Sequence, residues 1–469
     1  MAQLTDFERV RRRRAKRRTV RNLLALAIFA LFVFLCVLLI RRMGDVNLKT
    51  AYSDIKAEIS TGSGYPVTLP DSKIKHFDVS GEILALLSDT NIYTYNSSGK
   101  QLMRLQHGMV NQTMLTSHDR ILLYDRGGTK LSLLSKTGLT QSLTTNYMIY
   151  SADLAQNGNF AVATGSNQYL SQVTVYNKNA GEIFKWYSSE KPVISVSLSD
   201  TKDVMAVGCV DVSEGSYQSS ISRFQFSIDK EMNRADLPGE LLLTTDYWSG
   251  TIRAITDKRV VMFNGDLKEI ASYEFGEHKL NRFVHSQKGL IGFVLGDYSE
   301  DKQLTVVTLD NSLNELGRFT VNYDITSIRS DEKFIYLASK GQVEILHADG
   351  TPAARVPVNN LQGIEVVGDR LYDVTNAAID MIDVKAITAP PEESKPSSGK
   401  DTSSKSKGSS EKEQVSSEET RSEDTSAQLQ ESSSEPQNSL SEPQESSQAP
   451  SIEQPESGDL LNYDALEPV

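Results

Sequence analysis

The stretch Tyr95-Asn96-Ser97-Ser98-Gly99 decides the fold, because a turn of this kind, placed after apolar and aromatic residues, recurs along the chain. Similar turns are Leu134–Gly138, Tyr176–Gly181, Phe263–Gly265 and Leu346–Gly350, with weaker forms at Phe226–Asp229 and Leu309–Ser312. Successive turns are 36 to 48 residues apart. In a chain of short alternating apolar runs, this period indicates a β-propeller whose four-stranded blades take about 40 residues each.

A second turn precedes a strongly apolar strand in each repeat, and it occurs eight times. These strands are Ile83–Leu87, Ile121–Tyr124, Phe160–Ala163, Val204–Val207, Ile252–Ile255, Leu290–Val294, Phe334–Leu337 and Leu371–Val374. The eighth repeat ends after its third strand, Ala378–Val384, and Tyr65–Leu69 is available as the fourth. Closure by the opposite end of the chain removes the exposed edges of an open array.

We therefore predict an all-β fold, an eight-bladed propeller over residues 65–388. Seven blades result if the weak fifth repeat is miscounted. A pair of packed sheets with coincidental spacing is the alternative architecture.

The region before the repeats is typical of a membrane anchor. The 469 residues carry a formal net charge of −12, yet residues 1–49 carry +9. Leu23–Ile40 contains no polar side chain, and as a helix it is roughly 27 Å long, about the thickness of a hydrocarbon core. We predict a basic cytoplasmic segment at 1–21, a transmembrane helix at 22–40 and a juxtamembrane linker at 41–64. The bilayer is thus one predicted partner.

Charge sets the expected orientation of this anchor. Nine basic residues precede the apolar run and three follow it, so we expect a cytoplasmic N-terminus and an extracytoplasmic propeller in the cell membrane. A cleaved signal peptide, a buried core helix and a nucleic-acid-binding arginine patch are the other interpretations of this region. We expect no nucleic-acid partner, because a basic run beside a membrane helix sets topology.

The last region, residues 389–469, is predicted to be a disordered, extracytoplasmic tail. It carries a net charge of −12 and holds 21 Ser, 8 Pro and a single aromatic residue, Tyr463. Such a composition does not bury enough apolar surface to offset the entropy of ordering. Residues 459–466 are locally more apolar, which suggests either a short docking motif or simply the end of the tail.

The arginine-rich anchor, the repeats with their YNSSG-type turns and the Ser/Glu-rich tail together resemble an uncharacterised family of proteins from Gram-positive bacteria. Its members are single-pass membrane proteins with a WD-repeat-like outer propeller. This resemblance implies an architecture and carries no established activity. The Gly-His and Trp-Asp signature of true WD repeats is absent, since Trp186 and Trp248 are the only tryptophans.

No sequence motif predicts chemistry. The chain contains no nucleophile elbow, phosphate-binding loop, zinc-binding spacing or EF-hand. Cys36 lies in the predicted membrane helix, and Cys209 lies in an apolar strand, where we expect a buried, inert thiol. We therefore assign no catalytic, cofactor-binding or metal-binding residue and predict no cofactor.

Three expanded loops, each between the second and third strands of its blade, provide the candidate binding residues. They contain Tyr169, Tyr217 and Tyr298 among short polar residues. Long loops on a rigid scaffold often carry recognition, and tyrosine is a contact residue of low conformational entropy. We expect a polar binding face built on these tyrosines; the alternative is tolerated insertions that contain tyrosine by chance.

Two classes of function remain open. The first is a binding or scaffolding module for a surface protein or a cell-wall glycan. The second is a hydrolase or lyase that acts on a surface polymer in the propeller channel. The first strands of the blades carry scattered Asp, His and Arg with no repeated acidic pair, so binding is favoured over catalysis.

Overall fold

The computed structural model describes residues 22–34, 37, 48–70, 73–81, 83–118, 120–285, 289–296 and 303–389. Residues 22–34 and 37 are helical. Among the described residues, no helix is both long and apolar enough to cross a membrane. Residues 35, 36 and 38–40 of the predicted membrane segment, and the predicted tail from residue 390, lie outside the described residues.

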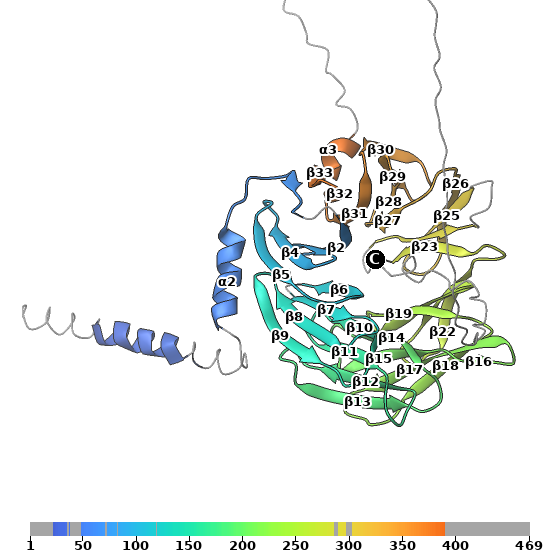
Figure 1. Ribbon diagram of the computed structural model, residues 1–469, viewed down its shortest axis with the longest axis horizontal. Coiled ribbons are helices and arrows are strands. Elements are labelled where there is room, and N and C mark those ends of the chain that lie inside the picture. The colour runs from blue at the N-terminus through green and yellow to red at the C-terminus, as the bar shows by residue number, and fades with distance from the viewer. Residues whose placement is uncertain are drawn as a thin grey trace, which may run out of the picture. The chain divides into compact units, whose positions relative to one another are not determined.

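The strands form eight antiparallel sheets, which follow one another around a ring (Figure 1). This confirms the predicted eight-bladed propeller and excludes seven blades.

The first four blades follow chain order. Blade 1 contains β2 (Ile74–Ser80), β3 (Ile83–Ser88), β4 (Asn91–Asn96) and β5 (Gln101–Gln106), and blade 2 contains β6 (Gln112–Ser117), β7 (Arg120–Asp125), β8 (Lys130–Ser135) and β9 (Gly138–Thr144). Blade 3 contains β10 (Ile149–Leu154), β11 (Phe160–Thr164), β12 (Ser171–Tyr176) and β13 (Glu182–Ser188). Blade 4 contains β14 (Val193–Leu198), β15 (Val204–Cys209), the short β16 (Val212–Ser213), β17 (Ser216–Gln225) and β18 (Asn233–Pro238).

The remaining blades repeat the same order. Blade 5 contains β19 (Leu242–Trp248), β20 (Thr251–Thr256), β21 (Arg259–Phe263) and β22 (Glu269–Glu274), and blade 6 contains β23 (Leu280–His285), β24 (Ile291–Leu295), β25 (Leu304–Leu309) and β26 (Glu315–Val321). Blade 7 contains β27 (Ser327–Ser330), β28 (Phe334–Ala338), β29 (Gln342–His347) and β30 (Pro352–Pro357). Blade 8 contains β31 (Leu361–Val367), β32 (Arg370–Thr375), β33 (Ala378–Asp383) and β1 (Val67–Thr68).

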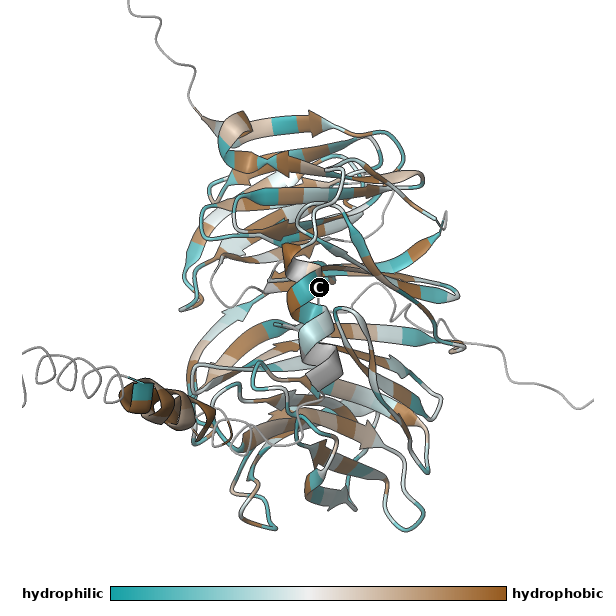
Figure 2. Ribbon diagram, turned by 90° about the vertical axis from the view of Figure 1, so that its left-hand side faces the viewer, coloured by the Kyte–Doolittle hydropathy of each residue, from teal (hydrophilic) through white to brown (hydrophobic). Residues whose placement is uncertain are grey.

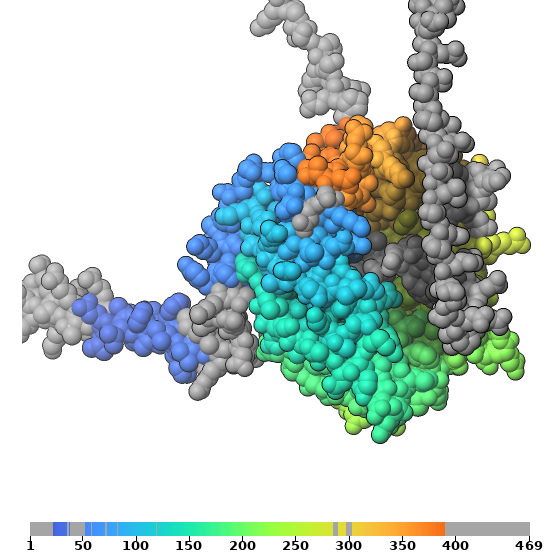
Figure 3. Space-filling model, in the orientation of Figure 1, coloured from blue at the N-terminus to red at the C-terminus, as the bar shows by residue number. Residues whose placement is uncertain are grey.

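The N-terminal strand closes the ring, as predicted. In blade 8, β1 pairs with β33 through Val67 opposite Ile379 and Thr68 opposite Ala378. The Leu69 amide extends the pairing by donating to the Ala377 carbonyl at 2.9 Å. In the space-filling view the blue start and the orange end of the propeller abut (Figure 3).

The hydrophobic core is divided among the seams between blades. Each of the eight seams holds one cluster of buried side chains in the described part of the chain. Phe184 of blade 3 and Phe224 of blade 4 belong to one such cluster, and Tyr372 of blade 8 and Tyr93 of blade 1 belong to another. Hydrophobic residues accordingly recur along the strands of the blades (Figure 2). Burial at the seams is what holds neighbouring blades together.

A helix that the sequence did not reveal lies on the outer rim. Helix α2 (Leu48–Ile59) falls within the predicted linker and contacts the turns that join the third and fourth strands of blades 1 and 2 (Figures 1 and 2). A short helix, α3 (Val384–Thr388), follows the last strand, and Asp383 caps it by accepting from the Ala386 amide at 3.3 Å.

Candidate functional site

One face of the ring carries both the connections between blades and the turns between second and third strands. Consecutive strands of a blade are antiparallel, so these two sets of segments emerge on the same side. We call it the loop face; on blades 2 to 5 it is formed by residues 107–111, 126–129, 145–148, 165–170, 189–192, 210–215 and 239–241. Its exposed and partly exposed apolar side chains include Val110, Tyr147, Met148, Tyr169, Leu170, Tyr187, Val212 and Tyr217.

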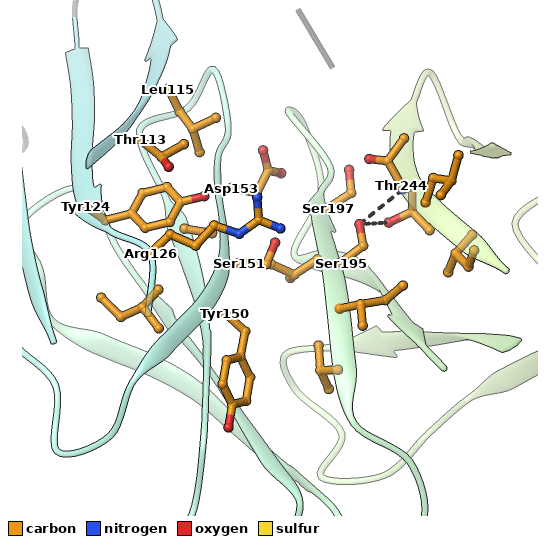
Figure 4. Close-up of a pocket in the computed structure, with 18 of the residues that line it drawn as sticks. Thr113, Leu115, Tyr124, Arg126, Tyr150, Ser151, Asp153, Ser195, Ser197 and Thr244 are labelled. Carbon is orange, nitrogen blue, oxygen red and sulfur yellow. Dashed lines mark hydrogen bonds between the residues drawn. The ribbon is translucent and has the colours of Figure 1, made fainter. Parts of the chain in front are cut away.

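A cavity of about 730 Å³ lies at the channel between the first strands of blades 2, 3, 4 and 5. Its lining begins at the loop face with Asn111, Arg126, Pro192 and Leu241 and extends along the strands. Figure 4 shows Arg126, Ser151, Asp153, Ser195 and Ser197 directed into this space. Its size is within the range of small-molecule and cofactor sites.

Side chains fix the start of three first strands around the cavity, from the same blade at β6 and from the preceding blade at β14 and β19. Asp125 accepts from the Asn111 amide at 2.8 Å, and Ser171 accepts from the Val193 amide at 3.0 Å. Ser219 likewise accepts from the Leu242 amide at 2.9 Å. These contacts make the cavity wall rigid at its mouth, which is a property that a recognition site needs.

The walls are also joined directly to one another. Asp153 on β10 accepts from the Leu198 amide on β14 at 2.6 Å. Ser195 and Ser197 on β14 accept from the amides of Thr245 and Tyr247 on β19, at 3.1 and 2.7 Å. Hydrogen bonds from backbone amides to short polar side chains therefore connect these three strands, in place of the backbone–backbone hydrogen bonds of a sheet.

The position of Asp153 has an equivalent on every first strand of the ring. The equivalent positions on the eight first strands are Asp78, Thr116, Asp153, Ser197, Asp246, Val284, Arg329 and Glu365. Four are carboxylates, and several bond to the next blade: Thr116 donates to Asp78, and Arg329 donates to Glu365. Of the carboxylates, Asp153 and Asp246 line the cavity.

Asp153 holds its proton unusually well. The pKa of Asp153 is raised to about 7, chiefly by burial, and the nearby charges of Asp246 and Asp200 contribute to the rise. The amides of Leu198 and Leu154 act in the opposite direction, because they stabilise the carboxylate. A carboxyl group of this kind exchanges a proton near neutral pH.

The tyrosines predicted as binding residues have three different outcomes. Tyr169 lies on the loop face of blade 3, 43% exposed, and its ring contacts that of Tyr187 with centroids 4.9 Å apart. Tyr217 lies at the start of β17 in blade 4 and is 40% exposed. Tyr298 lies outside the described residues. The structure thus places two of the three on the loop face and adds Tyr187, which lies at the end of β13 where no loop pattern marks it.

A smaller pocket of about 210 Å³ adjoins these aromatic residues, in the seam between blades 3 and 4. Tyr187, Glu190, Arg234 and Cys209 are among its lining residues. The pocket is polar because Arg234 pairs with Glu190 at 3.1 Å and Glu231 accepts from Ser222 at 3.0 Å. Cys209 is buried, as predicted, and burial raises the pKa of its thiol to about 12.

No group of three or more His, Cys, Asp or Glu side chains in the described part of the chain is arranged to hold a metal ion.

Comparison with known families then places the chain. Residues 56–362, from helix α2 to the first strand of blade 8, match a family model described as a family of unknown function, DUF5711. The chain belongs to the DUF5711 family. For this member of DUF5711, no curated protein is similar in sequence at a significant level.

Three solved structures that resemble this DUF5711 chain have low sequence identity to it. BamB from Moraxella catarrhalis is 13% identical, with a TM-score of 0.45, 69% of this chain covered and 99% of that chain. The C-terminal WD40 domain of Sif2 is 13% identical, with a TM-score of 0.47, 68% of this chain covered and 99% of that chain. A eukaryotic initiation factor is 12% identical, with a TM-score of 0.47, 70% of this chain covered and 89% of that chain. At these values the similarities carry no argument about function, and the fold assignment rests on the eight sheets.

Proposed function

We propose that the protein is a membrane-anchored, extracytoplasmic propeller that binds a partner through its loop face. The observation that carries this proposal is the cavity of about 730 Å³, which opens on the loop face of blades 2 to 5. A mostly apolar lining with a few polar groups directed into the cavity is the usual composition of a small-molecule site, and this cavity has it. The apolar segment Leu23–Ile40 and its basic flank support the anchoring and the orientation.

A surface glycan or a surface protein is the partner class that this face suits. Tyr169, Tyr187 and Tyr217 are partly exposed and supply flat apolar contacts, and the cavity offers hydroxyl and carboxyl groups for hydrogen bonds. Glycan or protein binding would place the chain at the surface of the cell as a binding or scaffolding module.

The test is capture by the full-length protein in detergent, with cell-wall glycan fragments and surface proteins offered separately. Ser151→Trp fills the cavity, because Ser151 points into it (Figure 4). Ser142→Trp is the matched control, because Ser142 is exposed on the outer strand β9. We expect Ser151→Trp to lose the captured partner and Ser142→Trp to keep it. Equal capture by both variants would exclude the cavity.

A hydrolase that cleaves a surface polymer is a second candidate, and one observation favours it. Asp153 and Asp246 both line the cavity, and the environment of Asp153 raises its pKa to about 7. A proton donor beside a second carboxylate is the arrangement that glycoside hydrolysis requires.

Asp153→Asn and Asp246→Asn should each abolish the release of reducing ends from wall polymer. Asp78→Asn is the control, because Asp78 has the equivalent position outside the cavity lining. No release by the wild-type protein would reject this candidate.

A further inference from the structure

Helix α2 has an inverted pattern of exposure. The side that packs on the propeller is small and polar, and includes Ser53, Asp54 and the buried Ala57. The opposite side exposes apolar residues: Tyr52 is 70% exposed, Ile55 58% and Ile59 78%. A helix on the surface of a soluble domain normally buries its apolar side instead.

Specific hydrogen bonds hold the helix in this orientation. Thr137 in the blade 2 turn donates to Asp54 at 2.6 Å and bonds Ser53 at 2.8 Å. Asn96 in the blade 1 turn donates to the Ser60 carbonyl at 2.7 Å, just after the helix. The polar side of α2 is therefore hydrogen-bonded to the propeller, and its apolar side faces outward.

The spacing of the exposed residues makes a continuous stripe. Positions 52, 55 and 59 are separated by three and four residues, which places them on one side of an α-helix. Lys56 is exposed beside them. An apolar stripe bordered by lysine is typical of a helix that lies in the interface of a lipid bilayer.

We propose that the stripe of Tyr52, Ile55 and Ile59 on helix α2 lies on the lipid surface of the membrane in which the chain is anchored. This inference rests on the anchor included in the proposed function. Seven residues, 41–47, separate the predicted membrane segment from α2, and seven extended residues reach at most about 25 Å. The anchor thus keeps the stripe within reach of its own bilayer.

The occupant favoured here is a bilayer and not a second copy of the chain. A bilayer covers the stripe without any further partner, and Lys56 matches the negative charge of anionic headgroups. Docking on lipid would hold the rim of blades 1 and 2 against the membrane.

Quenching by brominated lipid tests this contact. The full-length protein is reconstituted in vesicles of phosphatidylcholine and phosphatidylglycerol, with Tyr52→Trp, Ile55→Trp or Ile59→Trp as the probe. Val110→Trp is the control, because Val110 is 92% exposed on the connection between blades 1 and 2, at the loop face. Trp186 and Trp248 contribute the same background to every variant.

We expect brominated lipid to reduce the added fluorescence of each α2 probe by about twofold or more and to leave the control probe unchanged. Adding Ile59→Asp to Tyr52→Trp should weaken the quenching at position 52. Unquenched α2 probes in protein that still floats with the vesicles would overturn the lipid contact and leave the anchor standing. Concentration-dependent self-association that shields the probes from lipid would overturn it in favour of a second copy. Protein that fails to float with vesicles would overturn the anchor itself and the proposed function with it.

Discussion

Arg329 on β27 donates through Nε to Oε2 of Glu365 on β31 at 2.7 Å, so a buried ion pair joins the first strands of blades 7 and 8. Both side chains are nearly inaccessible, at 8% and 11% exposure. The pKa of Glu365 is raised to about 7, chiefly by burial; the charge of Arg329 opposes this rise and the charge of Asp78 adds to it. The arginine therefore stabilises the charged form of this carboxyl group inside the ring.

Removing the arginine should destabilise the propeller strongly. Arg329→Met leaves a buried carboxylate without its counter-ion, which costs about 3–5 kcal/mol of unfolding free energy. The loss should be larger at pH 8 than at pH 5.5, because protonation of Glu365 removes the uncompensated charge at the lower pH. Urea unfolding at the two pH values measures it. The double variant Arg329→Met with Glu365→Leu should recover most of the stability; a double variant as unstable as the single one would contradict this account.

Arg253 should respond less strongly to the same substitution. It lies opposite Asp246 across β19 and β20 and is 3% exposed, and its side-chain nitrogens have no hydrogen-bond partner among the described residues. Burial lowers the pKa of Arg253, and the charge of Asp246 offsets this only in part. We expect Arg253→Met to cost about 1–2 kcal/mol, less than Arg329→Met, because Arg253 loses a cation–π contact with the Trp248 ring, 5.9 Å from its centre, and no hydrogen bond. Denaturant unfolding of the two variants provides the comparison, and equal losses would contradict this account.

The pKa of Asp153 predicts a characteristic dependence of stability on pH. A folded-state pKa of about 7 lies above the ordinary value of 3.8, so the folded protein binds this proton more tightly than the unfolded chain. The stabilisation from this group is complete below about pH 4 and is lost as the pH rises through about 7. Asp153→Asn keeps an oxygen that accepts from the Leu198 amide and removes the titration. The unfolding free energy of the wild type minus that of the variant, measured by denaturant unfolding, should therefore fall between pH 5 and pH 8. A difference that stays constant with pH would show that Asp153 titrates normally.

The turn that identified the repeat also supports ring closure, and a pair of glycine variants tests this. At Gly99, φ is +75° and an added Cβ would lie 2.7 Å from the Gly64 carbonyl oxygen and 2.8 Å from Val67 of β1. Gly276 has a similar φ of +69° but nothing within 4 Å of an added Cβ. Gly276→Ala should cost about 1 kcal/mol for its backbone conformation, and Gly99→Ala should cost clearly more. Thermal unfolding compares the two, and equal losses would show that contact with the closing strand is unimportant.

Local patterns in the sequence were sufficient for the architecture. The turn at Gly99 and its repeats predicted the blade period, and the turn before each apolar strand, which occurs eight times, predicted the number of blades. Both signals are local because each blade is a continuous segment of chain with its own hydrophobic periodicity. The missing fourth strand of blade 8 led to the closing strand at Val67 in the same way. Helix α2 was not predicted, because three apolar residues at helical spacing in one short segment are a weak signal. The side that packs is set by contacts with Thr137 and Asn96, which lie far along the chain.

The candidate site was less predictable, because it depends on residues that are far apart in the chain. Asp153 and Asp246 belong to blades 3 and 5, and only the ring places both at one cavity. Tyr169 and Tyr217 were found from loop length, whereas Tyr187 ends a regular strand and was missed. A sequence pattern can show that a residue lies in a loop. It does not show which residues of different first strands meet at the central channel of the propeller.

The pairing of Val67 with Ile379 also imposes an order of events during synthesis. The closing strand emerges from the ribosome first, and its partner β33 emerges last, after every other blade strand has been made. The strands of seven blades are synthesised before β33, the partner of β1, is available to close the ring. In the nascent chain β1 therefore stays unpaired until translation is nearly finished. A chain that stops after Pro357 and before Ala378 keeps the strands of seven blades and leaves β1 without its partner, so its ring stays open.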